Sequence, residues 1–274
     1  MFDTVTVLAP KPTPRPVRYS IGTLVTDHAL YTEMLASFRA GGFMGEDCEY
    51  FAIDNTGASQ TSAFHGLNRV LNEANGDFVI LVHQDVCLLN DHRAELDLRL
   101  AELDRRDPAW GVAGNAGGAG PGRLALRITD GHAANQKVGD LPARVSALDE
   151  NLLIVRRSAR IGFSANLDGF HFYGADLCLA AETLGHSAYV IDFHVHHLSK
   201  GNKSPAFYQS ERAFRAKWAR AFRPRWIQTT CALVYLSGER MTHAVGGVSQ
   251  RLATKIARRL PGARGFPAKP RAEA

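Results

Sequence analysis

The chain has 274 residues, 45% of them hydrophobic and 22% charged, which is typical of a folded soluble protein and excludes disordered, collagen-like and membrane-spanning classes. A chain of this length buries about 70% of its unfolded surface or more, so we expect any metal ion to serve chemistry and not stability. The net charge of +5 arises in residues 238–274, where eight basic residues accompany two acidic ones, and it gives no reason to expect nucleic-acid binding.

The start of the chain lacks the features of a targeting segment. Residues 10–18 are rich in proline, and no basic, apolar signal sequence precedes them. The longest apolar run, from Phe78 to Leu89, is interrupted by His83 and Asp85 and is too short for a membrane span. Four widely spaced cysteines without a C-x-x-C pair indicate a reducing compartment. We therefore expect a cytoplasmic protein.

Strand and helix patterns alternate after the proline-rich segment. Apolar runs predict strands over 19–26, 49–54 and 78–82, and periodic apolar residues predict helices between them over 29–39 and 62–74. The strands show no polar alternation, which is typical of a parallel sheet covered on both faces. The sequence therefore predicts an α/β fold with a mostly parallel central sheet flanked by helices.

The second half of the chain is less regular. We interpret the glycine-rich segment 114–122 as a flexible connection, and residues 123–147 favour an insertion or a hairpin beside a site. The remaining predicted strands are 110–113, 152–155 and 188–192. The remaining predicted helices are 91–106, 175–184 and 207–222.

Polar side chains follow two of the predicted strands. Asp54 and Asn55 follow one strand, and His83 and Asp85 follow the next. In open parallel sheets, ligands bind beyond the carboxyl ends of the strands. Alternation along the chain places His83 and Asp85 on one face, where they can address one ligand, such as a divalent cation bound to a diphosphate. An Asp at a strand end is also a common turn former or helix cap, so Asp54 has two interpretations.

Two later segments carry further candidate groups. Residues 194–197 contain three histidines, which form either a polar loop or the completion of a metal site begun by Asp85. Such a mixed histidine and carboxylate set suits Mn²⁺ as well as Mg²⁺, or better. The aromatic-rich stretch 168–179 leads to Asp176, which is either a helix N-terminal carboxylate or a general base beside an aromatic wall for a sugar.

The order of these segments resembles the inverting type-A-fold glycosyltransferases of the large family 2-like group, in particular its streptomycin-biosynthesis-like branch. The segments are Thr26-Asp27, I-D-N-T at 53–56, G-L-N at 66–68, N-E-A-N-G-D-F at 72–78, V-H-Q-D-V at 82–86, L-D-E-N-L-L-I-V-R-R at 148–157, D-G-F-H-F-Y-G-A-D-L-C-L at 168–179 and H-L-S-K-G at 197–201. Together they span about two-thirds of the chain. The resemblance implies a Rossmann-like type-A glycosyltransferase fold.

The resemblance also implies roles for individual residues. It assigns the nucleotide-sugar site to Thr26, Asp54, Asn55, Asn68 and His83. It assigns the divalent cation to Asp85 and His197, with His196 as the near alternative, and the general base to Asp176. His83 stands where the family's D-x-D motif has its first carboxylate, which leaves Asp85 as the clearest metal ligand.

The function implied is metal-dependent, inverting transfer, of the hexosyltransferase type, from a nucleoside-diphosphate sugar to a hydroxyl acceptor. The acceptor would be a glycan, a lipid-linked molecule or a small molecule, in surface-glycan or secondary-metabolite assembly. Because His83 replaces a carboxylate, a non-catalytic nucleotide-sugar-binding or scaffold protein of the same fold is the alternative. A sugar-nucleotide pyrophosphorylase is a weaker option, since no glycine-rich, basic turn follows Thr26.

The end of the chain predicts a separate basic element. Apolar residues recur at spacings of three and four at Val245, Val248, Leu252, Ile256 and Leu260. Such an amphipathic helix either packs on the main domain or lies on an anionic membrane surface. We therefore expect a lead-in over 1–18, a glycosyltransferase domain over 19–237 and a basic helix and tail over 238–274, in a protein that is cytoplasmic or peripheral at the inner face of the membrane.

Overall fold

The computed structural model describes residues 16–199, 204–228, 233–239 and 256. The chain divides into two compact units, the first ending at Glu211 and the second beginning at Arg212, and each is described by itself. In chain order, the first unit contains β1 (Tyr19–Val25), α1 (His28–Ala40), β2 (Cys48–Asp54), α2 (Ala63–Glu73), β3 (Phe78–Val82), β4 (Val86–Leu88), α3 (Arg93–Arg106), β5 (Trp110–Gly114), β6 (Ala116–Gly120), β7 (Arg123–Thr129), β8 (Gln136–Val138), β9 (Ala143–Val145), β10 (Ala147–Leu148), β11 (Leu152–Arg156), the 3-10 turn η1 (Arg157–Ala159), α4 (Tyr173–Thr183), β12 (Ser187–Val190) and β13 (Val195–His197).

Helix α5 (Pro205–Ala221) begins in the first unit and ends in the second. It is followed by β14 (Arg225–Gln228) and β15 (Leu233–Leu236), which pair as an antiparallel hairpin. Apart from Gly238, Glu239 and Ile256, the basic helix and tail predicted over 238–274 lie outside the described residues, and so does the membrane contact proposed for them. No helix in the described part of the chain has both the length and the apolar character that a membrane crossing requires.

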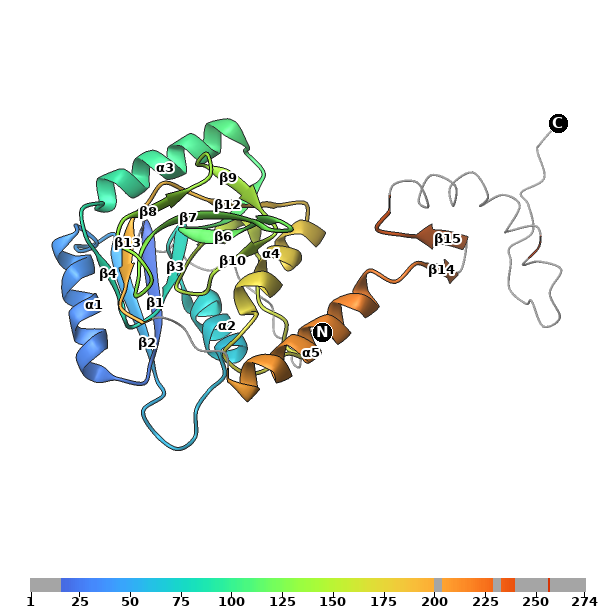
Figure 1. The fold of residues 1–274 in the computed structure, drawn as a ribbon, viewed down its shortest axis with the longest axis horizontal. Coiled ribbons are helices and arrows are strands. Elements are labelled where there is room, and N and C mark those ends of the chain that lie inside the picture. Colours follow the sequence, from blue (N-terminus) through green and yellow to red (C-terminus); the bar gives the residue numbers. More distant parts are fainter. Residues whose placement is uncertain (1–15, 200–203, 229–232, 240–255, 257–274) are drawn as a thin grey trace, which may run out of the picture. The chain divides into compact units, whose positions relative to one another are not determined.

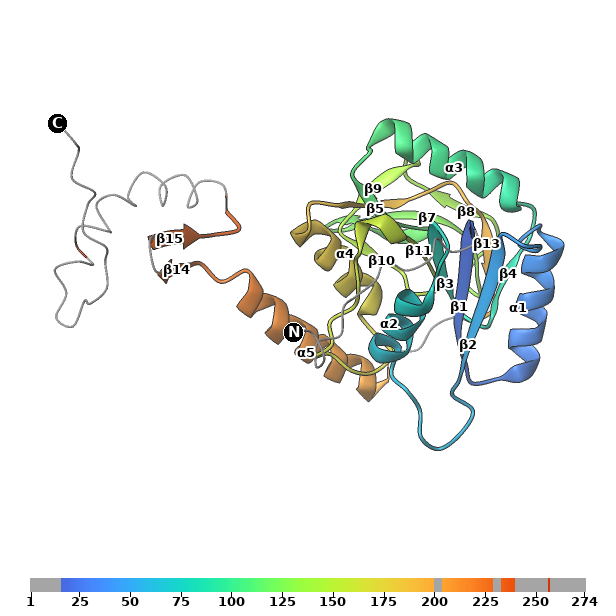
Figure 2. The same ribbon diagram turned by 180° about the vertical axis from the view of Figure 1, so that it is seen from behind.

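The central sheet has seven strands in the order β2-β1-β3-β11-β5-β12-β9 (Figures 1 and 2). Strands β2, β1 and β3 are parallel, as are β5 and β12, whereas β11 runs antiparallel between β3 and β5, and β9 runs antiparallel beside β12. The α/β architecture is confirmed, but three of the six neighbouring pairs are parallel, so the sheet is mixed. An apolar strand that is buried on both faces has the same sequence pattern whether it runs parallel or antiparallel to its neighbours. The sequence therefore could not predict that β11 is antiparallel.

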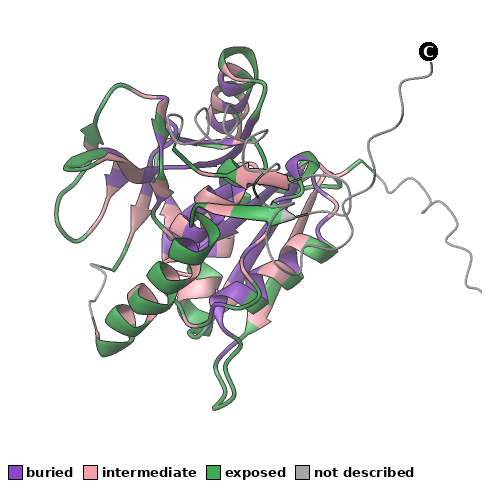
Figure 3. Ribbon diagram, turned by 90° about the vertical axis from the view of Figure 1, so that its right-hand side faces the viewer, coloured by how far each residue is buried: buried purple, intermediate pink, exposed green. Residues whose placement is uncertain are grey.

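Helices cover both faces of this sheet (Figures 1 and 2). Helices α1 and α3 pack on one face, where Phe38 and Leu100 join a core cluster with Tyr19, Ile21 and Ile80. Helices α2 and α4 contact the other face through β1, β5 and β12. Buried residues concentrate in the strands, and the outer sides of the helices are exposed (Figure 3).

A second sheet, in the order β10-β6-β7-β13-β4 with β8 beside β7, lies next to the first. Its strand β6 lies within the glycine-rich segment 114–122, so the prediction of a flexible connection is wrong. The physical reason is close packing: a Cβ on Gly117 would lie 2.4 Å from the carbonyl oxygen of Ala147, so glycine lets β10 pair tightly with β6. The hairpin expected within 123–147 is formed by β7 and β8.

The chain order of the first three strands creates a binding position. Strand β1 is followed by β2 on one side and then by β3 on the other, so the connections diverge at the carboxyl ends of β1 and β3. Ligands of open α/β sheets bind at such a topological switch point. The fold therefore predicts a ligand-binding site at the segments that follow Val25 and Val82.

A glycine on β1 allows α2 to approach the sheet, and this contact can be tested. A Cβ on Gly22 would lie 2.4 Å from Cγ1 of Val70 on α2. We expect Gly22→Ala to lower the free energy of unfolding in urea by about 1–3 kcal/mol, because added volume strains a packed core. The double variant Gly22→Ala/Val70→Ala should recover part of this loss, and equal stability of Gly22→Ala and the native protein would contradict the packing argument.

Candidate functional site

A pocket of about 250 Å³ lies at the carboxyl ends of β1 and β3. Its lining includes Leu24, Thr26, His83, Gln84, Asp85 and Glu150. We call it the strand-end pocket. The structure thus brings together three of the residues predicted from the sequence, namely Thr26, His83 and Asp85, at the topological switch point of the sheet.

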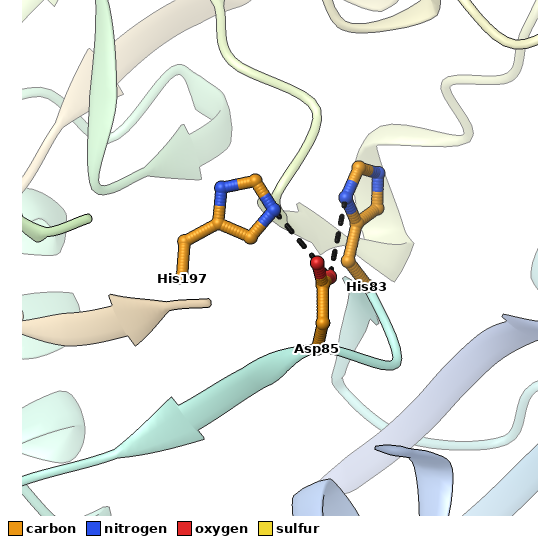
Figure 4. Close-up of side chains that lie close together, drawn as sticks. All are labelled: His83, Asp85 and His197. Atoms are coloured by element: carbon orange, nitrogen blue, oxygen red, sulfur yellow. Dashed lines mark ion pairs between the residues drawn. The ribbon is translucent and has the colours of Figure 1, made fainter. Parts of the chain in front are cut away.

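Three side chains lie close together (Figure 4), and two of them, His83 and Asp85, line this pocket. His83 follows β3, Asp85 precedes β4, and His197 ends β13. Oδ1 of Asp85 lies 3.4 Å from Nε2 of His197 and 3.9 Å from Nδ1 of His83. Antiparallel pairing of β13 with β4 places His197 opposite Val86, and so beside Asp85. Of the two alternative histidines, His197 and not His196 belongs to this cluster.

The electrostatics of the cluster favour an ionised carboxylate. Burial acts to raise the pKa of Asp85, but hydrogen bonding to His197 and the charge of both histidines outweigh it and lower the pKa to about 2. Asp85 conversely raises the pKa of His197 against the effect of burial. Burial, and then the charge of His197, lower the pKa of His83, which favours the neutral imidazole that a metal ion requires.

A hydrogen bond to Tyr173 orients the His83 ring. The phenol oxygen lies 2.6 Å from Nε2 of His83 and 3.3 Å from the carbonyl oxygen of Glu150. When the single phenol proton is donated to that carbonyl, Nε2 of His83 must donate to the phenol oxygen. The lone pair of His83 is then on Nδ1, the ring nitrogen that faces Asp85. Partners of this kind fix the tautomer of histidine ligands to metal ions.

The cluster fits a divalent cation. His83, Asp85 and His197 each offer one ligand atom, and these atoms lie within 4.8 Å of one another. Two ligands on opposite sides of one ion are about 4.2 Å apart for bonds of about 2.1 Å, so small side-chain movements suffice. Two imidazoles and one carboxylate suit Mn²⁺ and other transition metals better than Mg²⁺, which prefers oxygen ligands.

Gln84 holds the neighbouring turn in place, a role that the sequence did not reveal. Its Oε1 accepts from the backbone N–H groups of Thr26 and Asp27 at 2.7 and 2.9 Å, and its Nε2 donates to Oγ1 of Thr26 at 2.7 Å. These bonds join the end of β1 to the segment between β3 and β4. The position of Thr26 in the pocket therefore depends on Gln84.

Three residues assigned to the nucleotide sugar have other contacts. Asp54 is exposed and accepts from the backbone N–H and hydroxyl of Thr56, which is the turn-forming alternative. The buried Asn55 exchanges two hydrogen bonds with the backbone of Thr61. Asn68 exchanges two with the backbone of Phe163. None of the three lines the strand-end pocket, and the amides of the two asparagines are engaged in holding loops.

The predicted general base, Asp176, lies in the first turn of α4. Its side chain has no solvent-exposed surface, and its two carboxylate oxygens accept from the backbone N–H and the hydroxyl of Ser164 at 2.8 and 2.7 Å. Asp176 lines neither the strand-end pocket nor the neighbouring pocket between the second sheet and α4, so it is placed to anchor the segment around Ser164.

Sequence reasoning missed Glu150 as a site residue. It lies between β10 and β11 and lines the strand-end pocket beside His83. Burial, and then the adjacent Asp149, raise the pKa of Glu150 to about 7. The available signal was the L-D-E-N segment, where two carboxylates interrupt the approach to an apolar strand.

Metal binding tests the cluster directly. We expect Asp85→Asn to weaken Mn²⁺ binding by at least about 100-fold, because losing a group that only supports a ligand already costs about 10–100-fold. Isothermal titration calorimetry with Mn²⁺ and Mg²⁺ measures the affinities, and the native protein should bind Mn²⁺ more tightly. Asp140→Asn, at an exposed carboxylate outside the cluster, is the matched control. Unchanged Mn²⁺ affinity in Asp85→Asn would exclude the site.

The anchoring role of Asp176 predicts a loss of stability. We expect Asp176→Asn to lower the free energy of unfolding in urea by about 1–3 kcal/mol, because a buried donor of Ser164 loses its partner. Ser164→Ala removes one of the same bonds, so the effects of the two substitutions should not add in the double variant. Additive effects would contradict the proposed anchoring contact.

Comparison with known proteins supports this description of the fold. No family model matches the chain. A protein of Fuscovulum blasticum described as "ATP synthase subunits region ORF 6" is 36% identical over 228 residues, which span 80% of this chain and 91% of that protein. The mannosyltransferase PcManGT from Pyrobaculum calidifontis, solved in complex with GDP-Man and Mn²⁺, is 15% identical with a TM-score of 0.51, covering 78% of this chain and 67% of that one.

A further solved structure, S. aureus TarS 1-349 in complex with UDP-GlcNAc, is 13% identical with a TM-score of 0.49, covering 74% of this chain and 67% of that one. The likeness to the mannosyltransferase shows the fold, because identity is too low to carry substrate or activity. The identity and coverage of the Fuscovulum blasticum protein show common descent. The chain therefore belongs to the family of the Fuscovulum blasticum "ATP synthase subunits region ORF 6" protein and has the type-A glycosyltransferase fold.

Proposed function

We propose that the protein is a metal-dependent glycosyltransferase that moves a sugar from a nucleoside-diphosphate sugar to a hydroxyl acceptor. The observation that carries the proposal is the cluster of His83, Asp85 and His197 beside the strand-end pocket, at the topological switch point of a type-A glycosyltransferase fold. The mannosyltransferase with this fold was solved with GDP-Man and Mn²⁺, which supports a similar ligand pair here.

The lining of the pocket suits the two ends of such a donor. Leu24 and Leu67 offer apolar surface for a nucleoside, and the exposed Thr26 offers a hydroxyl beside it. Two members of the cluster, His83 and Asp85, line the same pocket, so a diphosphate bound there would lie beside them. A divalent cation bound there would offset the negative charge that develops on the departing nucleoside diphosphate. Without it, the ionised Asp85 would repel that diphosphate.

We further propose the inverting, hexosyltransferase-type mechanism and the streptomycin-biosynthesis-like branch, both on the strength of the sequence motifs. In an inverting transfer, the acceptor hydroxyl displaces the diphosphate in a single step, and a carboxylate, which the sequence motifs assign to Asp176, takes its proton. The nucleotide-sugar roles of Asp54, Asn55 and Asn68 would require their loops to rearrange around the donor, since their present contacts are with the backbone. A cytoplasmic location and contact of the basic tail with the membrane complete the proposal.

A donor screen tests the function. We expect one or more UDP-, GDP- or dTDP-sugars, with Mn²⁺, to raise the melting temperature, because a ligand at 100 times its Kd stabilises the folded state by about 2.7 kcal/mol. Release of nucleoside diphosphate from the same donor should follow, and a chelator should abolish it. Asp85→Asn should lose both effects, and Asp140→Asn should keep them.

The outcomes separate the proposal from its alternatives. Stabilisation by a donor without release of nucleoside diphosphate, with or without hydroxyl acceptors, would favour the non-catalytic binding protein. No stabilisation by any nucleotide sugar would contradict both. Release that persists in the chelator would contradict the role of the metal cluster.

A further inference from the structure

A pocket of about 390 Å³ lies at the opposite edge of the central sheet from the strand-end pocket. It is found where β1 and β3 begin and β11 ends, because the register pairs both Tyr19 and Arg156 with Phe78. We call it the arginine pocket, and the charged residues that line it are Arg18, Arg156, Arg157, Arg160, Asp77 and Asp104. Four guanidinium groups thus accompany two carboxylates. A concave surface with such an excess of positive charge attracts anions.

Two of these arginines are held by aromatic rings. The guanidinium carbon of Arg18 lies 5.3 Å from the centroid of the Phe78 ring. That of Arg156 lies 4.4 Å from the centroid of the Trp110 ring, which stacks on Phe78 at 5.9 Å. Each guanidinium group also forms an ion pair, with Asp97 and Asp104 respectively. Arg18 and Arg156 therefore form an ordered wall of the pocket, and their charges are already balanced by carboxylates.

The other two arginines, Arg157 and Arg160, are not balanced in this way. No carboxylate in the described part of the chain forms an ion pair with either of them. Nε of Arg157 donates to the carbonyl oxygen of Gly76 at 2.8 Å, which holds this side chain beside the start of β3. Both arginines also line an adjoining pocket of about 320 Å³. Two positive charges at the border of two hollows are thus left for a ligand.

The backbone at Arg160 indicates that its side chain has a function. Arg160 follows η1 in a left-handed conformation, with φ of 51° and ψ of 41°. Glycine and asparagine are favoured at such a position, because a Cβ followed by a long side chain is unfavourable there. An arginine therefore costs backbone stability, and what it adds is a guanidinium group in the arginine pocket.

We propose that the arginine pocket binds a phosphate or diphosphate group through Arg157 and Arg160. The planar guanidinium group donates pairs of N–H bonds that match phosphate oxygens. The hydroxyl of Ser158, which lies between the two arginines in the chain and also lines the pocket, can donate a further hydrogen bond. Such a site goes beyond the proposed function, because it is separate from the place of the donor diphosphate and needs no metal ion. The phosphate group belongs either to a free phosphate compound or to a phospholipid headgroup.

The test is isothermal titration calorimetry of the full chain with inorganic pyrophosphate, in a chelator so that the metal cluster holds no ion. We expect the native protein to bind one pyrophosphate, more weakly as salt is added. Arg157→Gln should weaken binding about 10–100-fold, the usual effect of losing hydrogen bonds to a charged group. The matched control is Arg123→Gln, at an exposed arginine on β7 that does not line this pocket. Both this control and Asp85→Asn should bind like the native protein.

Two further variants separate ligand binding from a structural role. Arg160→Gly should weaken pyrophosphate binding as much as Arg157→Gln, yet the melting temperature without ligand should not fall, because glycine favours the left-handed conformation. Asp77→Asn should strengthen binding, because it removes a negative charge from the lining. A purely structural role for Arg160 would instead lower the melting temperature and leave the affinity unchanged.

Vesicles distinguish the two sources of the phosphate group. Native protein and Arg157→Gln are sedimented with phosphatidylcholine vesicles that either contain or lack phosphatidic acid. A specific loss of sedimentation with phosphatidic acid in Arg157→Gln would identify a headgroup, and equal sedimentation would identify a free phosphate compound. Pyrophosphate binding that is absent, or that is unchanged in Arg157→Gln and Arg160→Gly, would overturn the inference. Failure of the donor screen would contradict the proposed function and leave this site unaffected.

Discussion

The pairing of β4 with β13 is the constraint on which the whole site depends. These strands are more than a hundred residues apart in sequence, and their antiparallel register sets His197 opposite Val86. The backbone N–H of Leu198 also donates to the carbonyl oxygen of Asp85 at 2.9 Å, which fixes the register at its end. A slip by one residue would turn His197 to the opposite face of the sheet and separate it from Asp85. The histidine therefore belongs to the site through backbone hydrogen bonds, before any side-chain contact is considered.

The pKa values of two carboxyl groups near this pairing are shifted in opposite directions. Asp85 lies between two imidazoles, and its pKa falls to about 2. Burial, and then the adjacent Asp149, raise the pKa of Glu150 to about 7. The two carboxyl groups therefore differ in charge near neutral pH, because Asp85 is ionised and Glu150 is partly protonated. The fold supplies them on the two sides of Tyr173, whose hydroxyl contacts His83 and the backbone of Glu150.

The sequence predicted those parts of the site whose signal is local. His83 and Asp85 interrupt an apolar run, and the ends of β1 and β3 meet at one edge because parallel neighbours must, so their meeting could be anticipated. The same motif logic failed to anticipate the contacts of Asn55 and Asn68, because an amide that binds a ligand and one that holds a loop look alike in sequence. The antiparallel direction of β11 could not be predicted from the sequence either, because both of its faces are buried.

The glycines show most clearly why the rest of the site required the structure. In sequence, Gly117 and Gly174 are typical of flexible segments, yet each marks a place where a backbone carbonyl lies against the Cα of another element. At Gly174, a larger residue would push α4 away from Leu148 and so separate Tyr173 from the Glu150 carbonyl. At Gly117, it would open the pairing of β6 with β10, which forms one side of the neighbouring pocket between the second sheet and α4. The position of α4 and the pairing of β6 with β10 therefore depend on the lack of a side chain at Gly174 and Gly117. This role cannot be predicted from the sequence, because it depends on which atoms each glycine faces in the fold.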